Sequence, residues 1–189
     1  MLNKFKGAML GGLVGDCLGA TFEMQYENMV PENKVTKFLD QVKKINETAD
    51  SDQEDGFAYT DDTAMARQIA MSFIEQKKVD ITHVARSFTR EYYREPWRGY
   101  GGSVVEVFKK LRDAERGGEA GTGDPLRPAR EQFSGSGSYG NGAGMRAHPL
   151  ALACYNRYIG ELIVGGLFRH NPNKSQGRVR DRCHLRRGC

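Results

Sequence analysis

The feature that most constrains the fold is a four-residue recurrence of apolar side chains at the start of the chain. The positions that recur are Phe5, Met9, Leu13 and Cys17, with Leu10, Val14 and Leu18 beside them. The pattern predicts a first helix capped by Asn3. Glycine at an inner helix position costs about 1 kcal/mol relative to alanine, and this stretch contains five, Gly7, Gly11, Gly12, Gly15 and Gly19. So many glycines are plausible only if another helix or a ligand comes close.

Asp16 is an unusual residue on this predicted apolar face. A carboxylate inside an apolar surface needs hydrogen-bond partners or a charged ligand. Two interpretations therefore stay open for Asp16, a satisfied structural carboxylate or a member of a functional site.

Helical periodicity continues along the chain. Further helices are predicted from Thr60 to about Gln76, from a cap at Asp80 to a stop before Pro96, from near Ser103, and around Leu150–Leu167. Between them, the second half of Asp40–Gly56, the glycine-rich Arg116–Asp124 and the long Gly/Ser segment Phe133–Arg146 are expected to be loops. No strong period-two strand pattern appears, so the predicted fold class is all-α.

The chain length and apolar runs limit the class of protein. With 189 residues the chain is long enough for one globular domain with a sizeable core. No apolar run reaches the ~18 residues that cross a bilayer, and Asp16 interrupts the only stretch that resembles a signal peptide. Cys17 and Cys154 lie in apolar surroundings, which suits reduced thiols in an intracellular protein. Membrane association is not expected.

The net charge of +4 is unevenly distributed. From Arg169 to the end there are seven basic residues and one acid, whereas the rest of the chain carries 21 basic and 23 acidic residues. We therefore expect a domain over residues 1–168 and a disordered basic tail over 169–189. Such a tail is compatible with nucleic-acid contact, but solvated disorder is the more common state, so nucleic acid is not an expected partner.

The sequence YTDDTAMA places a hydroxyl and two carboxylates side by side at Thr60, Asp61 and Asp62. A helix N-terminus favours acids in its first turn, which explains the cluster without any function. Alternatively, the three oxygens form part of a Mg²⁺ site, because Mg²⁺ prefers about six oxygen ligands. In that case the cluster needs further oxygens from elsewhere in the fold or from a phosphate-bearing ligand.

A second candidate feature is GSGSYGNGAG, from Gly135 to Gly144. Its glycines allow positive φ angles that turn backbone N–H groups inward and form an anion-binding nest. Ser138 and Asn141 add hydrogen-bonding side chains, and Tyr139 offers a flat face for a base or sugar. A flexible linker is the alternative interpretation. RGYGGS, from Arg98 to Ser103, is a smaller glycine-rich turn before a predicted helix and is another candidate phosphate-binding site.

Four motifs together resemble those of the ADP-ribosylglycohydrolase family. They are GDCLGATFE, YTDDTAMA, RGYGGSVVEVFKKL and GSYGNGAGMR, which occur in the family's order between about Phe5 and Arg146. The likeness is strongest to the animal branch that acts on ADP-ribosylated serine. It implies an all-α fold with a binuclear Mg²⁺ centre that holds ADP-ribose.

The resemblance also implies roles for particular residues. Thr60, Asp61 and Asp62 match the family's first metal-ligand motif, and Glu23 matches a glutamate that lies beside the metals and opens or closes the site. Asp61, Asp62 and Glu23 are thus the expected catalytic residues, with Glu23 also a possible acid or base. The loop around the diphosphate and ribose matches Ser136, Gly137, Ser138, Tyr139, Gly140, Asn141 and Gly142.

The implied activity is Mg²⁺-dependent hydrolysis at the anomeric carbon of the ribose, which releases ADP-ribose from serine on proteins. Poly(ADP-ribose) and O-acetyl-ADP-ribose are related substrates, and the implied context is the DNA damage response. The expected partners are ADP-ribose and ADP-ribosylated proteins. The expected protein is a monomer of the nucleus, cytoplasm or mitochondria.

The chain also departs from the family pattern. The family's late Gly-Asp-x-Asp-Thr motif has no counterpart, because the only acids after residue 150 are Glu161 and Asp181. The family's later histidine has none either, since His148 follows the glycine segment too closely. We therefore expect a C-terminally truncated domain, and keep a non-catalytic ADP-ribose-binding protein as the alternative function.

Overall fold

The computed structural model describes residues 1–23, 30–47, 56–119, 123–136, 138 and 140–155. Every regular element in this part of the chain is helical, which confirms the all-α prediction there. The α-helices are α1 (Leu2–Glu23), α2 (Glu32–Glu47), α3 (Asp61–Gln76), α4 (Ile81–Arg94), α5 (Gly102–Ala114), α6 (Arg127–Arg130), α7 (Gly142–Met145) and α8 (His148–Ala153). A π-helical turn, η1 (Glu115–Glu119), follows α5, and a 3-10 turn, η2 (Gln132–Gly135), follows α6.

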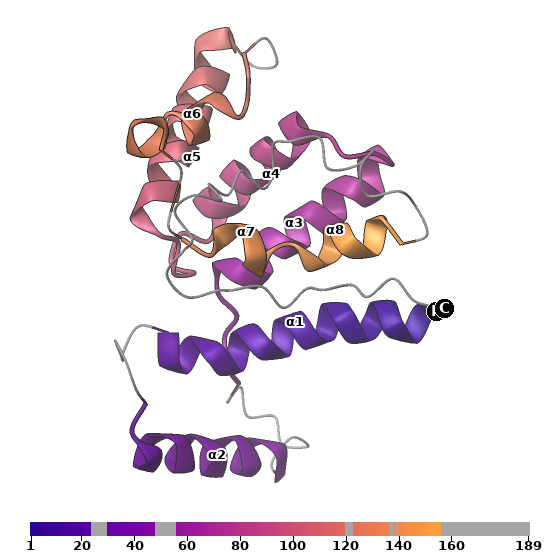
Figure 1. The fold of residues 1–189 in the computed structure, drawn as a ribbon, viewed down its shortest axis with the longest axis vertical. Helices are drawn as coiled ribbons and strands as arrows, with labels where there is room; N and C mark the ends of the chain where they lie inside the picture. Colours follow the sequence, from indigo (N-terminus) through magenta and orange to yellow (C-terminus); the bar gives the residue numbers. More distant parts are fainter. Residues whose placement is uncertain (24–29, 48–55, 120–122, 137, 139, 156–189) are drawn as a thin grey trace.

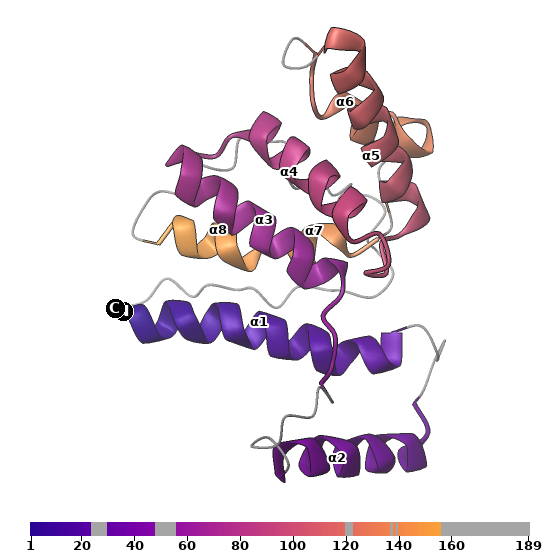
Figure 2. The same ribbon diagram turned by 180° about the vertical axis from the view of Figure 1, so that it is seen from behind.

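The helices are arranged in successive layers, with α3 in a central position. In Figures 1 and 2, α1 lies between α2 on one side and the pair α3 and α8 on the other. Helix α3 contacts α1, α4, α7 and α8, while α5 contacts α4 and α6. The first turn of α3 therefore lies where several elements converge.

The hydrophobic core lies between α3, α4 and α5. Its buried side chains are Met65, Ile69, Val84, Phe88 and Phe108. Helix α1 contributes no buried residue, although it contacts α3 and α8. Burial of apolar area is the main stabilising contribution to a fold, so most of that stabilisation comes from the helices after residue 60.

The ends of α3 and α4 follow the predicted capping. Thr60 is the N-cap of α3, and Asp80 is the N-cap of α4 and accepts a hydrogen bond from His83 N at 2.9 Å. Lys77 ends α3 with a left-handed φ of 57° and donates its N–H to the carbonyl of Phe73. Helix α4 ends before Pro96 as predicted, because proline cannot supply the N–H that continues a helix.

The start of α1 differs from the prediction. The helix begins at Leu2, so Asn3 lies inside it and is not its cap. The carbonyl of Met1 accepts hydrogen bonds from the N–H groups of Lys4 and Phe5, at 3.0 and 3.4 Å, and so begins the helical ladder.

Helix α2 was not predicted. The stretch Asp40–Gly56 is polar and acidic, with a loop predicted for its second half, and its residues up to Glu47 are helical. Phe38 is the buried residue of α2 and makes aromatic contacts with Phe22 of α1, at 4.9 Å between ring centroids, and with Phe57, at 5.3 Å. The predicted mobile loop lies at residues 48–55, outside the described residues.

Two other loop predictions are partly wrong. Glu115–Glu119 forms η1, and Arg86 Nε lies 3.4 Å from Glu115 Oε1, so the start of the predicted flexible segment Arg116–Asp124 is helical. The predicted Gly/Ser loop contains η2 and α7. The predicted last helix begins earlier, at His148, and its stretch beyond residue 155 lies outside the described residues, as does the basic tail.

None of the helices in the described ranges combines the length and the apolar character that crossing a membrane requires.

Candidate functional site

The first turn of α3 forms the centre of the candidate site. Thr60 has an extended backbone and accepts a hydrogen bond from Asp62 N at its Oγ1, at 3.3 Å. Asp61 N donates to the carbonyl of Arg98 at 2.7 Å. The prediction that adjacent acids are accommodated at a helix N-terminus is therefore confirmed, since both carboxylates lie in the first turn.

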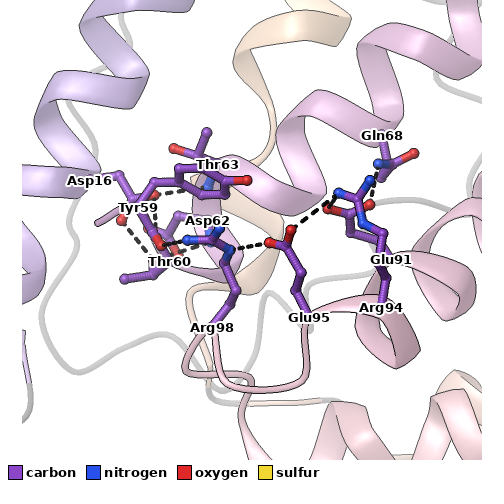
Figure 3. A network of polar contacts seen from close by, with 10 residues as sticks. All are labelled: Asp16, Tyr59, Thr60, Asp62, Thr63, Gln68, Glu91, Arg94, Glu95 and Arg98. Carbon is purple, nitrogen blue, oxygen red and sulfur yellow. Dashed lines mark hydrogen bonds and ion pairs between the residues drawn. The ribbon is translucent and has the colours of Figure 1, made fainter. Parts of the chain in front are cut away.

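Asp16 of α1 caps the same turn from another helix (Figure 3). Its Oδ2 accepts hydrogen bonds from Thr60 N at 2.9 Å and Thr63 N at 3.0 Å, and its Oδ1 accepts one from Thr60 Oγ1 at 2.6 Å. Asp16 is thus a satisfied carboxylate that joins α1 to α3. The first interpretation, a satisfied structural carboxylate, is therefore confirmed, and the same side chain also lines the cleft described next.

A cleft of about 270 Å³ lies between α1, the start of α3 and the start of α8. Its lining residues are Gly12, Gly15, Asp16, Gly19, Ala20, Glu23, Asp62, Thr63, Met145 and His148. The fold therefore brings Glu23 and Asp62, which were predicted as site residues, to one cleft. A Cβ atom at Gly15 or Gly19 would meet nothing within 4 Å, so these glycines leave one wall of the cleft open.

The carboxylates around this cleft destabilise one another as anions. Burial raises the pKa of Asp61 to about 6, and the charges of Asp62, Glu23 and Asp16 add to the effect. Burial likewise raises the pKa of Asp62 to about 6, with contributions from Asp16 and Glu23. Near neutral pH the site carries closely spaced negative charge, which a bound cation would stabilise.

Asp61 points toward a different neighbour from Asp62 and does not line the cleft. Its Oδ1 lies 3.8 Å from the position that a Cβ of Gly99 would occupy, and Gly99 has a left-handed φ of 86°. The turn at Gly99 is held by Arg98, whose guanidinium lies 3.6 Å from the centroid of the Tyr59 ring and donates to the Tyr59 carbonyl at 2.8 Å. Asp61 thus lies beside the turn at Gly99, whereas Asp62 lines the cleft.

The predicted diphosphate loop is only partly described. Gly137 and Tyr139 lie outside the described residues, and none of the remaining positions, Ser136, Ser138, Gly140, Asn141 and Gly142, lines the cleft. Gly135 has a positive φ of 76°, whereas Gly142 and Gly144 lie in the α7 turn, so the expected positive φ is wrong at these two glycines. Gly140 N donates to Ser138 Oγ at 3.0 Å, which uses one N–H of the predicted nest locally.

His148 is a cleft residue for which the sequence predicted no role. Its Nε2 would lie 2.9 Å from a Cβ atom at Gly12, so the imidazole packs against the bare backbone of α1. Burial lowers the pKa of His148, while a hydrogen bond with the Met145 backbone acts in the opposite direction. The glycine at position 12 was the available sequence signal, but nothing local identifies its partner 136 residues later.

The candidate ligand oxygens are of the type that Mg²⁺ prefers, but they do not form a complete coordination site. Thr60 Oγ1 and the carboxylates of Asp61, Asp62 and Glu23 are hard oxygen ligands of the kind that Mg²⁺ prefers. Within the described part of the chain, no three His, Cys, Asp or Glu side chains are arranged to hold a metal ion. The described residues therefore fit as part of a ligand set.

Comparisons with known proteins agree with this arrangement. A family model described as ADP-ribosylglycohydrolase matches residues 1–164. This chain belongs to the ADP-ribosylglycohydrolase family. The match extends beyond Arg146, where the motif resemblance ends, and it includes both α1 and α3 with the cleft between them.

Several proteins named ADP-ribosylhydrolase ARH3 are similar to this chain over most of its length. This chain is 43% identical over 154 residues to ADP-ribosylhydrolase ARH3 of Xenopus tropicalis, and the aligned region covers 80% of this chain and 40% of that protein. It is 38% identical over 152 residues to ADP-ribosylhydrolase ARH3 of Homo sapiens, with coverages of 80% and 40%. For ADP-ribosylhydrolase ARH3 of Danio rerio the identity is 39% over 158 residues, with coverages of 83% and 39%. The chain therefore spans about 40% of the length of the curated relatives it matches.

Proposed function

We propose that this protein is a Mg²⁺-dependent hydrolase that removes ADP-ribose from modified serine on proteins. The observation that carries the proposal is the acidic cleft between α1 and α3 in a member of the ADP-ribosylglycohydrolase family. The proteins similar to this chain are named ADP-ribosylhydrolase. Poly(ADP-ribose) and O-acetyl-ADP-ribose are further proposed substrates, because they share the bond at the anomeric carbon of the ribose.

The proposed reaction breaks the bond between the anomeric carbon and the serine oxygen. The oxygen of water bonds to that carbon, one proton of the water is removed, and a proton is delivered to the serine oxygen. Bond cleavage of this kind passes through an oxocarbenium-like state that nearby carboxylates stabilise. The carboxylates of Asp16, Glu23 and Asp62 line the cleft and supply such negative charge.

In this proposal Thr60, Asp61 and Asp62 hold Mg²⁺, and Glu23 lies beside the reacting bond. When bound, Mg²⁺ orients the ribose and lowers the pKa of water. Glu23 is exposed at the last residue of α1, where its carboxylate can move into or away from the cleft. It acts as the gate and as an acid or base for the proton transfers.

The decisive experiment is turnover of a serine-ADP-ribosylated peptide by the full chain in Mg²⁺ and in EDTA. We expect released ADP-ribose in Mg²⁺ only, and a loss of at least about 100-fold in Asp62→Asn, since the substitution removes the negative charge and one of the two carboxylate oxygens. Asp80→Asn is the matched control, because Asp80 caps α4 away from the cleft. Equal turnover in Asp62→Asn and wild type would refute the proposed site.

A second candidate function is ADP-ribose binding without cleavage. The favouring observation is that the described acids do not form a metal-holding group of three. Isothermal titration with ADP-ribose in Mg²⁺, combined with the peptide-turnover assay, separates the two candidates. Heat of binding without release of ADP-ribose from the peptide would support the binder, whereas turnover would support the hydrolase.

A further inference from the structure

Arg146, which follows α7, is a partly buried cation that forms no direct ion pair among the described residues. Its Nη1 donates to Met65 Sδ at 3.3 Å, and its Cζ lies 5.2 Å from the centroid of the Phe88 ring. Its Nε is buried and has no hydrogen-bond partner. Burial lowers the pKa of Arg146 to about 10, which leaves it charged at neutral pH. A charge that is largely removed from water and makes no direct ion pair is unfavourable for folding, so its position calls for an explanation.

The contacts place Arg146 between two predicted parts of the site. Met65 lies four residues after Asp61, so the two side chains share one face of α3 and are one turn apart. The guanidinium therefore lies near the Asp61 carboxylate, whose charge partly offsets the effect of burial on the pKa of Arg146. The same Nη1 atom is 4.0 Å from the position that a Cβ of Gly142 would occupy.

We propose that Arg146 is a positioning residue that links the glycine segment 140–144 to Asp61. Its charge balances Asp61, and its planar guanidinium supports the backbone at Gly142. The inference rests on the proposed function, in which Asp61 holds Mg²⁺ and the glycine segment contacts ADP-ribose. Because Arg146 and Mg²⁺ act on the same carboxylate, they oppose each other electrostatically.

This arrangement has a consequence that a purely structural residue would not produce. Arg146→Met keeps a long apolar side chain but removes the charge and the fork of donors. Mg²⁺ should then bind more tightly, while ADP-ribose should bind more weakly because the glycine segment loses its support. Arg146→Lys keeps the charge, so Mg²⁺ binding should stay unchanged while ADP-ribose binding falls.

The test measures both affinities in the full chain. Mg²⁺ is titrated alone and followed by the shift in melting temperature, and ADP-ribose is titrated calorimetrically at saturating Mg²⁺. For Arg146→Met we expect a Mg²⁺ midpoint about threefold lower or more and an ADP-ribose Kd about tenfold higher. Arg67→Met is the control, because Arg67 is an exposed arginine on α3, the helix that carries Asp61; it should change neither value by more than about twofold.

Each outcome decides the inference. A parallel loss of both affinities in Arg146→Met, or an unchanged Mg²⁺ midpoint, would overturn it. If Arg146→Met does not fold, unchanged ADP-ribose binding in Arg146→Lys would overturn it instead. A wild-type chain that binds Mg²⁺ but not ADP-ribose would refute the proposed function, and the Mg²⁺ comparison alone would then decide whether Arg146 acts on Asp61.

Discussion

The hydroxyl of Thr60 has a defined set of hydrogen bonds. It donates its proton to Asp16 Oδ1 and accepts from Asp62 N, at 2.6 and 3.3 Å. A threonine hydroxyl has one proton and two acceptor lone pairs, so one lone pair remains for a cation. Asp16 therefore determines how Thr60 presents its oxygen, although it need not bind the cation itself.

Replacing Asp16 by asparagine tests this role. The new amide oxygen can still accept from Thr60 N and Thr63 N, but the amide NH₂ would donate to Thr60 Oγ1 and occupy its second lone pair. We expect a loss of folding stability of only about 1 kcal/mol and a Mg²⁺ midpoint at least about tenfold higher, measured by urea unfolding and by Mg²⁺ titration. Glu23→Gln removes one charge from the same cleft without touching Thr60. An equal weakening in both variants would attribute the effect to charge alone.

The raised pKa values of the two adjacent acids predict how stability depends on pH. Because the pKa of Asp62 is about 6 in the folded chain and 3.8 ordinarily, the folded state holds this proton more tightly. Stability should therefore fall as pH rises from about 4 to 6, by on the order of 1 kcal/mol for Asp61 and Asp62 together after solvent screening. Melting curves at pH 4.5 and pH 7.5 in EDTA measure this fall, and Asp62→Asn should reduce it.

Asp80 provides the control for the pH experiment. The His83 N–H lowers the pKa of Asp80, so its contribution is complete above its ordinary pKa of 3.8 and stays constant over this pH range. Asp80→Asn should lower the melting temperature at both pH values by a similar amount. A change in slope as large as that of Asp62→Asn would contradict the assignment to the acidic turn.

The glycines of α1 test how closely two helices approach. Gly11→Ala should stabilise the chain by roughly 0.5–1 kcal/mol, because alanine is the better helix former and a Cβ atom there meets nothing within 4 Å. Gly12→Ala would place a Cβ atom 2.9 Å from His148 Nε2, so the imidazole must move. We expect Gly12→Ala to be about 1 kcal/mol or more less stable than Gly11→Ala, as measured by urea unfolding.

His148→Ala completes this comparison. In a chain that already carries His148→Ala, the two alanine substitutions should have similar effects, because the clash at position 12 is gone. If Gly12→Ala remains the less stable of the two in that background, the contact with His148 is not the cause.

At the scale of elements, the sequence predicts those helices that bury an apolar face and carry a cap. Helices α3 and α4 combine periodic core residues with Thr60 and Asp80 at their starts, and these signals are local. Helix α2 has apolar residues at helical spacing, Val35, Phe38, Leu39, Val42 and Ile45, but Pro31 rather than a capping side chain precedes Glu32, so one of the two signals was absent. The short turns within the glycine segment bury no residue and were read as loop.

The site itself was predictable only where its signal is local. The Thr-Asp-Asp cluster is recognisable in the sequence, whereas Asp16 meets Thr60 across 44 residues and Arg146 meets Met65 across 81. Such pairings depend on how the helices pack, which periodicity does not specify. The capping of the first turn of α3 by Asp16 was therefore visible only in the folded chain.

The molecule as a whole divides into a core and a less buried helix that together enclose the cleft. The core of α3, α4 and α5 contains the buried cluster, whereas α1 has no buried residue and exposes 59% of Leu10 and 53% of Val14. The free energy of local opening increases with buried apolar contact. Helix α1 should thus open more readily than α3, even though Asp16 joins the two.

Hydrogen exchange followed by mass spectrometry tests this division. Without ligand, we expect amides of α1 to exchange about tenfold or more faster than those of the middle of α3, since local opening costs less where burial is low. Mg²⁺ and ADP-ribose together should slow exchange in α1, because a ligand in the cleft contacts Asp16 and Glu23 of α1 as well as the first turn of α3. Mg²⁺ with ribose 5-phosphate, which lacks the nucleotide, is the control and should protect less. Protection confined to α3, with α1 unchanged, would mean that the ligand does not use the wall formed by α1.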